Sequence, residues 1–197
     1  MPVIRELVVR ILLLISIALF AFQVVASNKV SEQNHVVLVT NKGNIVISLN
    51  EQAAPKTVEN FKSYVASGFY NDTIFHRVIA GFMIQGGGFD QQLKRKSAQS
   101  AIRNEADNGL ENVVGTIAMA RTADPHSATS QFFINVADNR SLNHVTKQGN
   151  GWGYAVFGKV TEGLDIVLAI SNQITTSKQG YRDVPVDPVI IEKAYLK

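Results

Sequence analysis

The sequence has 197 residues, of which 46% are hydrophobic and 18% are charged, so it is long enough to bury a core and we predict one globular domain. Its formal net charge of +3 is small, and the basic run Lys94-Arg95-Lys96 has no interleaved aromatic residues, so we expect no nucleic-acid partner. The chain has no cysteine, which excludes disulfides, thiol catalysis and thiolate metal sites.

The N-terminal segment has the pattern of an export signal. Arg5 and Arg10 flank its start, residues 11–22 are apolar apart from Ser16, and residues 24–26 end in the small Ala26. We therefore predict a signal peptide over residues 1–26.

Cleavage of this signal before Ser27 would leave a flexible lead-in over residues 27–34 and a folded domain over 35–197. The protein would then be periplasmic, with no membrane attachment. The alternative is an uncleaved anchor, but residues 11–26 are fewer than the roughly 20 needed to span a bilayer comfortably.

The first folded elements are a hairpin and a helix. An apolar run over residues 36–39 and an alternating run over 45–49 flank the turn signal Asn41-Lys42-Gly43. Pro55 suits the first turn of a helix, and apolar residues then recur at helical spacing. We predict that this helix covers residues 56–67.

The central stretch, residues 75–87, sets Arg77 and Gln85 among large apolar side chains and ends in glycines. Buried in a core strand, these two polar residues would need partners, but they suit the wall of an apolar pocket that holds a ligand through a few polar atoms. We predict two short strands around Ala80-Gly81. The glycines at 86–88 allow tight turns and lack the Lys-Ser/Thr of a phosphate loop.

The rest of the chain favours an all-β domain. Residues 89–113 are polar and predict a long surface loop, and residues 164–168 a second short helix. Many short strands with only two helices favour an antiparallel barrel or sandwich capped by helices. The remaining predicted strands cover residues 116–120, 131–136, 154–160 and 189–196.

Several motifs, in order, resemble the cyclophilins over about residues 36–196. They are Phe75-His76-Arg77, residues 81–87 (GFMIQGG), 115–120 (GTIAMA), 130–134 (SQFFI) and 156–160 (VFGKV). Residues 102–106 and the loop after Met119 resemble the bacterial, often periplasmic, branch. The resemblance implies a closed eight-stranded antiparallel β-barrel with two capping α-helices, and peptidyl-prolyl cis-trans isomerase activity without a cofactor or metal.

The residues fit that chemistry. Rotating an X-Pro bond breaks no covalent bond, so a catalyst must stabilise the twisted amide better than either planar form. Arg77 is the expected catalytic residue, since its donors can face the prolyl nitrogen, and Gln85 is expected to assist it. The other expected site residues bind the substrate: Phe82, Met83, Phe133 and Leu142 as the apolar pocket for the proline ring, and Gln131 as a residue that orients Arg77 or the substrate backbone. The resemblance implies that Ala120 and Arg121 bind the extended peptide and that Tyr154 lies at the pocket.

Two positions depart from the best-known family members. Ser141 precedes the pocket leucine where they carry tryptophan, and Tyr154 stands where they carry histidine. Serine supplies neither the area nor the N–H of an indole, so we expect weak cyclosporin binding and slower turnover or altered peptide preference. Trp152 lies in a nearby glycine-rich loop, although we do not expect it to compensate.

Other functions have weaker support. A chaperone that binds proline-containing polypeptides without catalysis would not need the cation of Arg77. A hydrolase using Asp124, His126 and Ser130 has no Gly-x-Ser-x-Gly motif, and the scattered histidines form no metal motif, so we read His76 and the others as packing or loop residues. We therefore predict a monomeric isomerase whose partners are proline-containing exported polypeptides.

Overall fold

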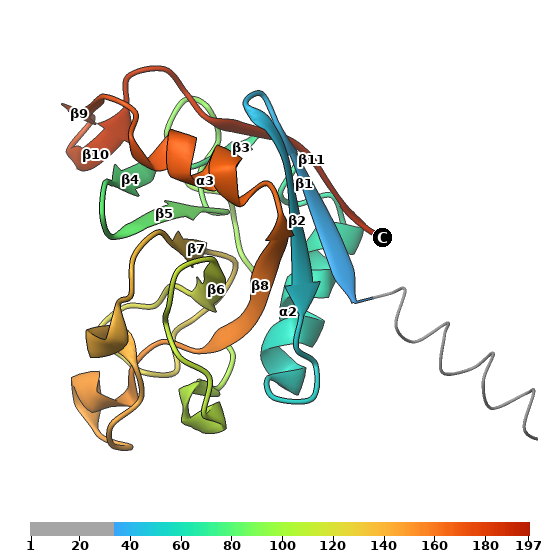
Figure 1. Ribbon diagram of the computed structural model, residues 1–197, viewed down its shortest axis with the longest axis vertical. Coiled ribbons are helices and arrows are strands. Elements are labelled where there is room, and N and C mark those ends of the chain that lie inside the picture. The colour runs from blue at the N-terminus through green and yellow to red at the C-terminus, as the bar shows by residue number, and fades with distance from the viewer. Residues whose placement is uncertain (1–33) are drawn as a thin grey trace, which may run out of the picture. The chain divides into compact units, whose positions relative to one another are not determined.

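The computed structural model describes residues 34–197, in which a nine-stranded antiparallel sheet is accompanied by a two-stranded ribbon and two α-helices (Figure 1). No helix in this described part is both long and apolar enough to cross a membrane. The predicted signal peptide (1–26) and all but the last residue of the predicted lead-in (27–34) lie outside the described residues and stay predictions.

The sheet order is β3-β11-β1-β2-β8-β6-β7-β5-β4, and β9 and β10 form the separate ribbon. The strands are β1 (His35–Thr40), β2 (Gly43–Leu49), β3 (Thr73–Ile74), β4 (Arg77–Ile79), β5 (Met83–Gly86), β6 (Thr116–Met119), β7 (Phe132–Asn135), β8 (Val156–Glu162), β9 (Thr175–Lys178), β10 (Tyr181–Pro185) and β11 (Ile190–Leu196). The helices are α2 (Pro55–Ala66) and α3 (Leu164–Ser171), with 3-10 turns at Ala106–Asn108, Arg140–Leu142 and Gly149–Trp152.

The predicted hairpin and first helix are confirmed. Thr40 pairs with Gly43 across a two-residue turn, and Gly43 has a φ of +131°, which only glycine adopts readily. Helix α2 begins at Pro55 and buries Val58 and Phe61. Its observed bounds differ from the predicted 56–67 by one residue at each end, as is usual where helix ends fray.

The mainly β fold with two helices is confirmed, whereas a closed eight-stranded barrel describes it only approximately. The outermost strands of the sheet, β3 and β4, are separated in the chain by only Phe75 and His76. One bent segment, residues 73–79, therefore supplies both edges. The backbone N–H of Phe75 donates to Val189 O, on the β11 side, and β3 and β4 do not pair with each other, so the nine-stranded sheet curls round without a continuous ladder.

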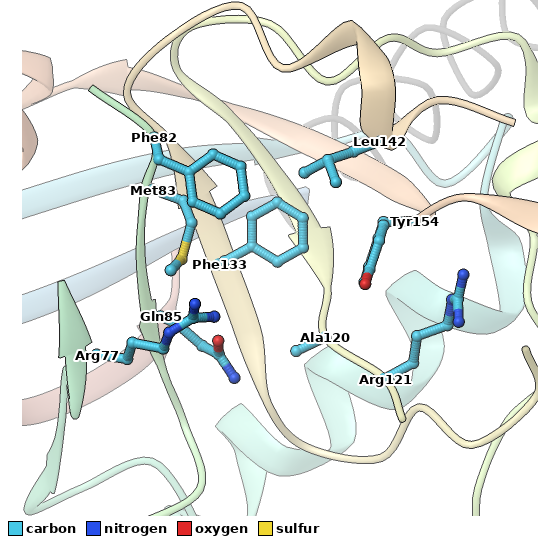
Figure 2. A pocket seen from close by; sticks show the side chains of 9 residues that line it. All are labelled: Arg77, Phe82, Met83, Gln85, Ala120, Arg121, Phe133, Leu142 and Tyr154. Carbon is cyan, nitrogen blue, oxygen red and sulfur yellow. The ribbon is translucent and has the colours of Figure 1, made fainter. Parts of the chain in front are cut away.

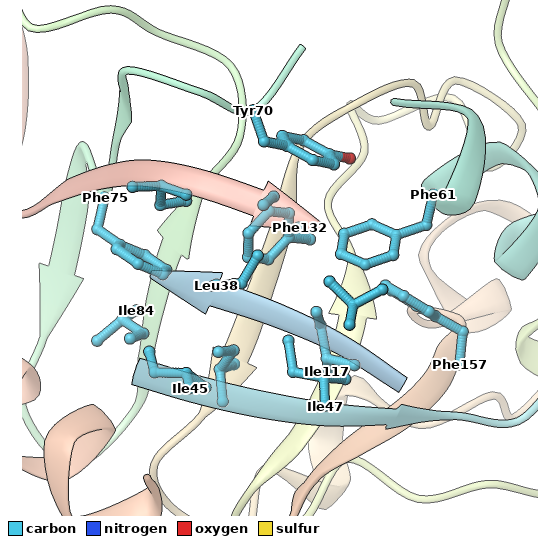
Figure 3. Packing of buried hydrophobic residues seen from close by; sticks show 14 of the residues in the cluster. Leu38, Ile45, Ile47, Phe61, Tyr70, Phe75, Ile84, Ile117, Phe132 and Phe157 are labelled. Atoms are coloured by element: carbon cyan, nitrogen blue, oxygen red, sulfur yellow. The ribbon is translucent and has the colours of Figure 1, made fainter. Parts of the chain in front are cut away.

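The main core fills the inside of the curled sheet. Aromatic rings from different elements meet there: Phe61 of α2 lies 5.5 Å from Phe132 of β7 and 5.1 Å from Phe157 of β8, between ring centroids. Aliphatic side chains from the strands surround them (Figure 3). Helix α2 packs against β11, while α3 contacts β2, β4 and β5.

Two regions differ from the sequence-based prediction. The predicted surface loop over residues 89–113 buries Phe89 and Leu93, and the carboxylate of Glu105 accepts hydrogen bonds from the first turn of α2, at Lys56 N and Thr57 N. The loop therefore also supports the fold. The ribbon β9–β10 was not predicted, because residues 175–178 are polar and mostly exposed and carry no apolar alternation.

Candidate active site

The predicted site residues converge on one cavity of about 220 Å³ (Figure 2). All of them except Gln131 line it. The lining is Arg77, Phe82, Met83, Gln85, Ala120, Arg121, Phe133, Leu142 and Tyr154. These side chains come from β4, β5, β7, the end of β6 and the loops before β8, so only the folded sheet brings them together.

Strand alternation explains which side chains face the cavity. Arg77, Gln85 and Phe133 lie directly opposite one another on β4, β5 and β7, and therefore form one row across the outer face of the sheet. The next row, one residue along each strand, points into the main core. That row is Val78, Ile84, Ile134 and Ile117.

The apolar half of the cavity is a hydrophobic cluster separate from the main core. Met83 and Phe133 are its buried members at the cavity, with exposed fractions of 3% and 4%. Phe82, Leu142 and Tyr154 are only partly buried and pack against them. Apolar surface that remains reachable beside Arg77 is what a proline ring would need.

Gln131 lies beside the cavity and contacts it through Gln85. The Gln85 Nε2 donates to Gln131 Oε1 over 2.9 Å. Gly88 makes room for this arrangement, because a Cβ there would lie 2.5 Å from Gln131 Cγ. At Gly87, a Cβ would lie 2.9 Å from the Phe132 ring. The glycine run therefore serves close packing against side chains as well as backbone turning.

Arg121 and Tyr154 form the opposite wall. The guanidinium of Arg121 lies 4.6 Å from the centroid of the Tyr154 ring, and its Nε donates to Gly153 O over 2.9 Å. The Tyr154 ring meets Phe133 edge to face, at 5.6 Å between centroids. Tyr154 thus closes the pocket with an aromatic face.

Three buried asparagines behind the cavity were missed by the sequence reasoning. Asn139 Nδ2 donates to Phe82 O over 2.7 Å and to Asn135 Oδ1 over 2.7 Å. Asn112 Nδ2 donates to the carbonyls of Leu142 and Tyr154, each at 3.3 Å. These amides fix the backbone that carries three pocket side chains. The sequence did contain one signal for this network, because Asn135 is a polar residue inside the apolar run of residues 132–136.

Of the two departures from the family pattern, Tyr154 lines the cavity and Ser141 does not. Ser141 is exposed on the 3-10 turn beside Leu142 and does not line the cavity. Trp152 is buried and packs against His126 and His144, with ring centroids 4.9 Å and 5.3 Å away, so it too is absent from the lining. Trp152 therefore supplies no aromatic face to the cavity.

His76 is a packing residue, as predicted. It is 5% exposed, and its ring lies 4.5 Å from that of Phe89. Burial, together with the charges of Arg77 and Arg95, lowers the pKa of His76 to about 4. The imidazole is therefore neutral at physiological pH, next to the cation of Arg77.

The residues of the hydrolase alternative do not form a triad. The Asp124 carboxylate accepts the backbone N–H of His126, and His126 Nδ1 accepts the backbone N–H of Asn104. Ser130 is 2% exposed. Within residues 34–197, no three His, Cys, Asp or Glu side chains are grouped to hold a metal ion.

Comparison with known proteins agrees with this geometry. Residues 35–196 match the family described as cyclophilin type peptidyl-prolyl cis-trans isomerase. Peptidyl-prolyl cis-trans isomerase cyp18 of Streptomyces antibioticus is 63% identical over 159 residues, 81% of this chain and 96% of that protein. Peptidyl-prolyl cis-trans isomerase B of Escherichia coli strain K12 is 54% identical over 157 residues, 80% of this chain and 96% of that protein.

A solved structure shares the fold. The crystal structure of a Cryptosporidium parvum cyclophilin type peptidyl-prolyl cis-trans isomerase, obtained in the presence of the dipeptide Ala-Pro, has a TM-score of 0.70 and 29% identity and covers 83% of this chain and 98% of its own. We conclude that this chain belongs to the cyclophilin-type peptidyl-prolyl cis-trans isomerases and catalyses the isomerisation for which they are named.

Proposed function

We propose that the chain isomerises X-Pro bonds of exported polypeptides, with Arg77 as the catalytic residue. The observation that carries this proposal is the row Arg77-Gln85-Phe133, which sets a guanidinium beside an apolar surface. The uncatalysed rotation has a barrier of about 18–20 kcal/mol, because the nitrogen lone pair is delocalised into the carbonyl.

Arg77 lowers this barrier by stabilising the twisted state. As the bond rotates, the lone pair localises on the prolyl nitrogen, and a guanidinium N–H donates to it. The planar ground states lack this localised lone pair, so the interaction is stronger in the transition state. Gln85 holds the substrate backbone or the guanidinium on the side where Gln131 fixes its amide.

The proline ring occupies the apolar cluster of Met83, Phe82, Phe133 and Leu142. The hydrophobic packing holds the ring while the preceding carbonyl turns. The Ala-Pro dipeptide used with the Cryptosporidium parvum relative supports a proline-containing ligand for this cavity. Arg121 and Tyr154 then flank the extended peptide.

The test is isomerisation of a neutral proline-containing peptide by wild type, Arg77→Ala and Arg77→Lys. We expect Arg77→Ala to lower kcat/KM by roughly 100-fold and Arg77→Lys to remain well below wild type, because an ammonium lacks the fixed fork of donors. The matched control is Lys159→Ala, which removes an exposed cation on β8. Full activity of Arg77→Ala would contradict the role of Arg77, and peptide binding without catalysis by wild type would favour the chaperone alternative.

Export is the second part of the proposal. Residues 1–26 are removed before Ser27, the net charge falls from +3 to about +2 with the loss of Arg5, Arg10 and Glu6, and the periplasmic protein is a monomer. Cell fractionation, the N-terminal sequence and light scattering of the purified protein test these points. A full-length chain held in the membrane fraction would favour the anchor.

A further inference from the structure

The ribbon β9–β10 lies against β4, the strand that carries Arg77 (Figure 1). Two side chains of β10, Tyr181 and Val184, hold the ribbon in this position by packing contacts. The Tyr181 ring lies 5.0 Å from that of Phe89, between centroids, and Val184 is buried in a small cluster with Ile74 and Leu93. Both anchors attach to the segments on either side of β4, so the ribbon is held next to the catalytic strand.

Between these anchors the ribbon contains a bulge. Tyr181 pairs with Lys178 and Val184 with Thr176, so two residues of β10, Arg182 and Asp183, face one residue of β9. Asp183 has a φ of +60°, in the left-handed region that residues other than glycine seldom adopt. Bulges of this kind turn a side chain towards a new direction, often beside active sites.

The side chain turned in this way reaches Arg77. Asp183 Oδ2 lies 3.6 Å from Arg77 Nε, the distance of an ion pair, and about two-fifths of each side chain is exposed. An ion pair this exposed contributes little to folding stability. A gain in stability therefore does not explain the bulge or the left-handed backbone conformation of Asp183. Orientation of the Arg77 guanidinium does explain them.

We propose that Asp183 is a positioning residue for Arg77. Its carboxylate attracts Nε from the ribbon side, so the two terminal amino groups of the guanidinium remain free for the substrate. Gln85 lies opposite Arg77 on the other neighbouring strand, so the arginine is flanked by β5 and by the ribbon. This inference rests on the catalytic role proposed for Arg77.

Two variants separate charge from backbone conformation. Asp183→Asn keeps the size of the side chain and tolerates a positive φ, but removes the charge. Asp183→Gly removes the side chain and relieves the backbone. Asp187→Asn is the matched control, because it removes an exposed carboxylate near the same ribbon without touching Arg77. All are measured with a neutral peptide, so that salt acts on the enzyme alone.

We expect Asp183→Asn and Asp183→Gly each to lower kcat roughly fivefold with little change in KM. A fivefold fall in kcat corresponds to an activation free energy raised by about 1 kcal/mol, which is the scale of an exposed ion pair. Raising the ionic strength from about 0.01 M to about 1 M should lower wild-type kcat towards the variant value and leave both variants unchanged. In an Arg77→Ala background, Asp183→Asn should have no further effect.

Wild-type kcat in both Asp183 variants, or an equal loss in Asp187→Asn, would overturn the inference. So would a loss that persists unchanged in the Arg77→Ala background. If Arg77→Ala itself kept full activity, the catalytic role of Arg77 would fail first, so the two failures are distinguishable.

Discussion

Gln85 Nε2 donates a hydrogen bond to Gln131 Oε1 over 2.9 Å, which joins two residues 46 positions apart in the chain. Gln85 lies opposite Arg77, and Gln131 lies two residues before Phe133 of the pocket. The bond therefore links the polar and apolar halves of the site, and it sets the orientation of the Gln85 amide on the strand next to Arg77.

Gln131 should affect catalysis without touching the proline ring. In Gln131→Leu, the Gln85 amide loses its acceptor and can rotate. We therefore expect kcat/KM to fall roughly fivefold, a change whose free energy equals that of one typical hydrogen bond. Gln131→Glu retains an acceptor oxygen at the same place and should keep more activity than Gln131→Leu. Equal activity of the leucine variant and wild type would contradict this role.

Gly88 should matter because of the same contact. The Cβ of Gly88→Ala would lie 2.5 Å from Gln131 Cγ, so Gln131 must move and Gln85 loses its partner. We expect a fall in kcat/KM of roughly tenfold, since small displacements near the reacting group are costly. The matched measurement is Gly88→Ala in a Gln131→Ala background, where the clashing Cγ is gone. An equal loss in both backgrounds would show that the clash is not the cause.

Burial of His76 predicts acid sensitivity of the fold. The pKa of His76 is lowered to about 4 in the folded protein, from an ordinary 6.5. Between these values the unfolded chain binds the proton and the folded protein does not, so stability falls as the pH falls. The loss should be of the order of 3 kcal/mol from pH 6.5 to pH 4 and should then level off.

Urea unfolding of wild type and His76→Phe across this pH range measures that contribution. Phenylalanine fills the buried site beside Phe89 but does not titrate, so the variant should lose less stability on acidification. Carboxylates titrate in both proteins, and the difference between the two curves isolates His76. Parallel curves would show that His76 is not the cause.

Ser141 should limit cyclosporin binding. It is exposed beside Leu142 of the pocket, where a tryptophan would add apolar surface and an N–H donor. We expect weak binding by wild type and a gain of about tenfold or more in Ser141→Trp, with Ser141→Ala as the control. Tight and equal binding by wild type and Ser141→Trp would contradict this expectation.

Much of the fold follows from local patterns. Alternation with the turn at Asn41-Lys42 predicts the first hairpin, and Pro55 with the helical spacing of Val58 and Phe61 predicts α2, because these signals depend only on neighbours in the chain. The predicted site residues came instead from long motifs that resemble those of the cyclophilins. In the folded protein, nine of them line one cavity.

The tertiary structure decided what depends on distant pairing. The polar residues of β9 form a strand only because β10 pairs with them, and no local sequence pattern predicts this strand. Asp183 forms an ion pair with Arg77, although the two residues are more than one hundred positions apart in the sequence. The contact depends on a bulge and a positive φ that no local sequence pattern predicts. The sequence by itself determined the two helices, most strands of the main sheet and the residue types of the pocket, because these follow from local patterns and motifs. Long-range pairing formed the ribbon β9–β10 and placed Asp183, Gln131 and the buried asparagines around the pocket.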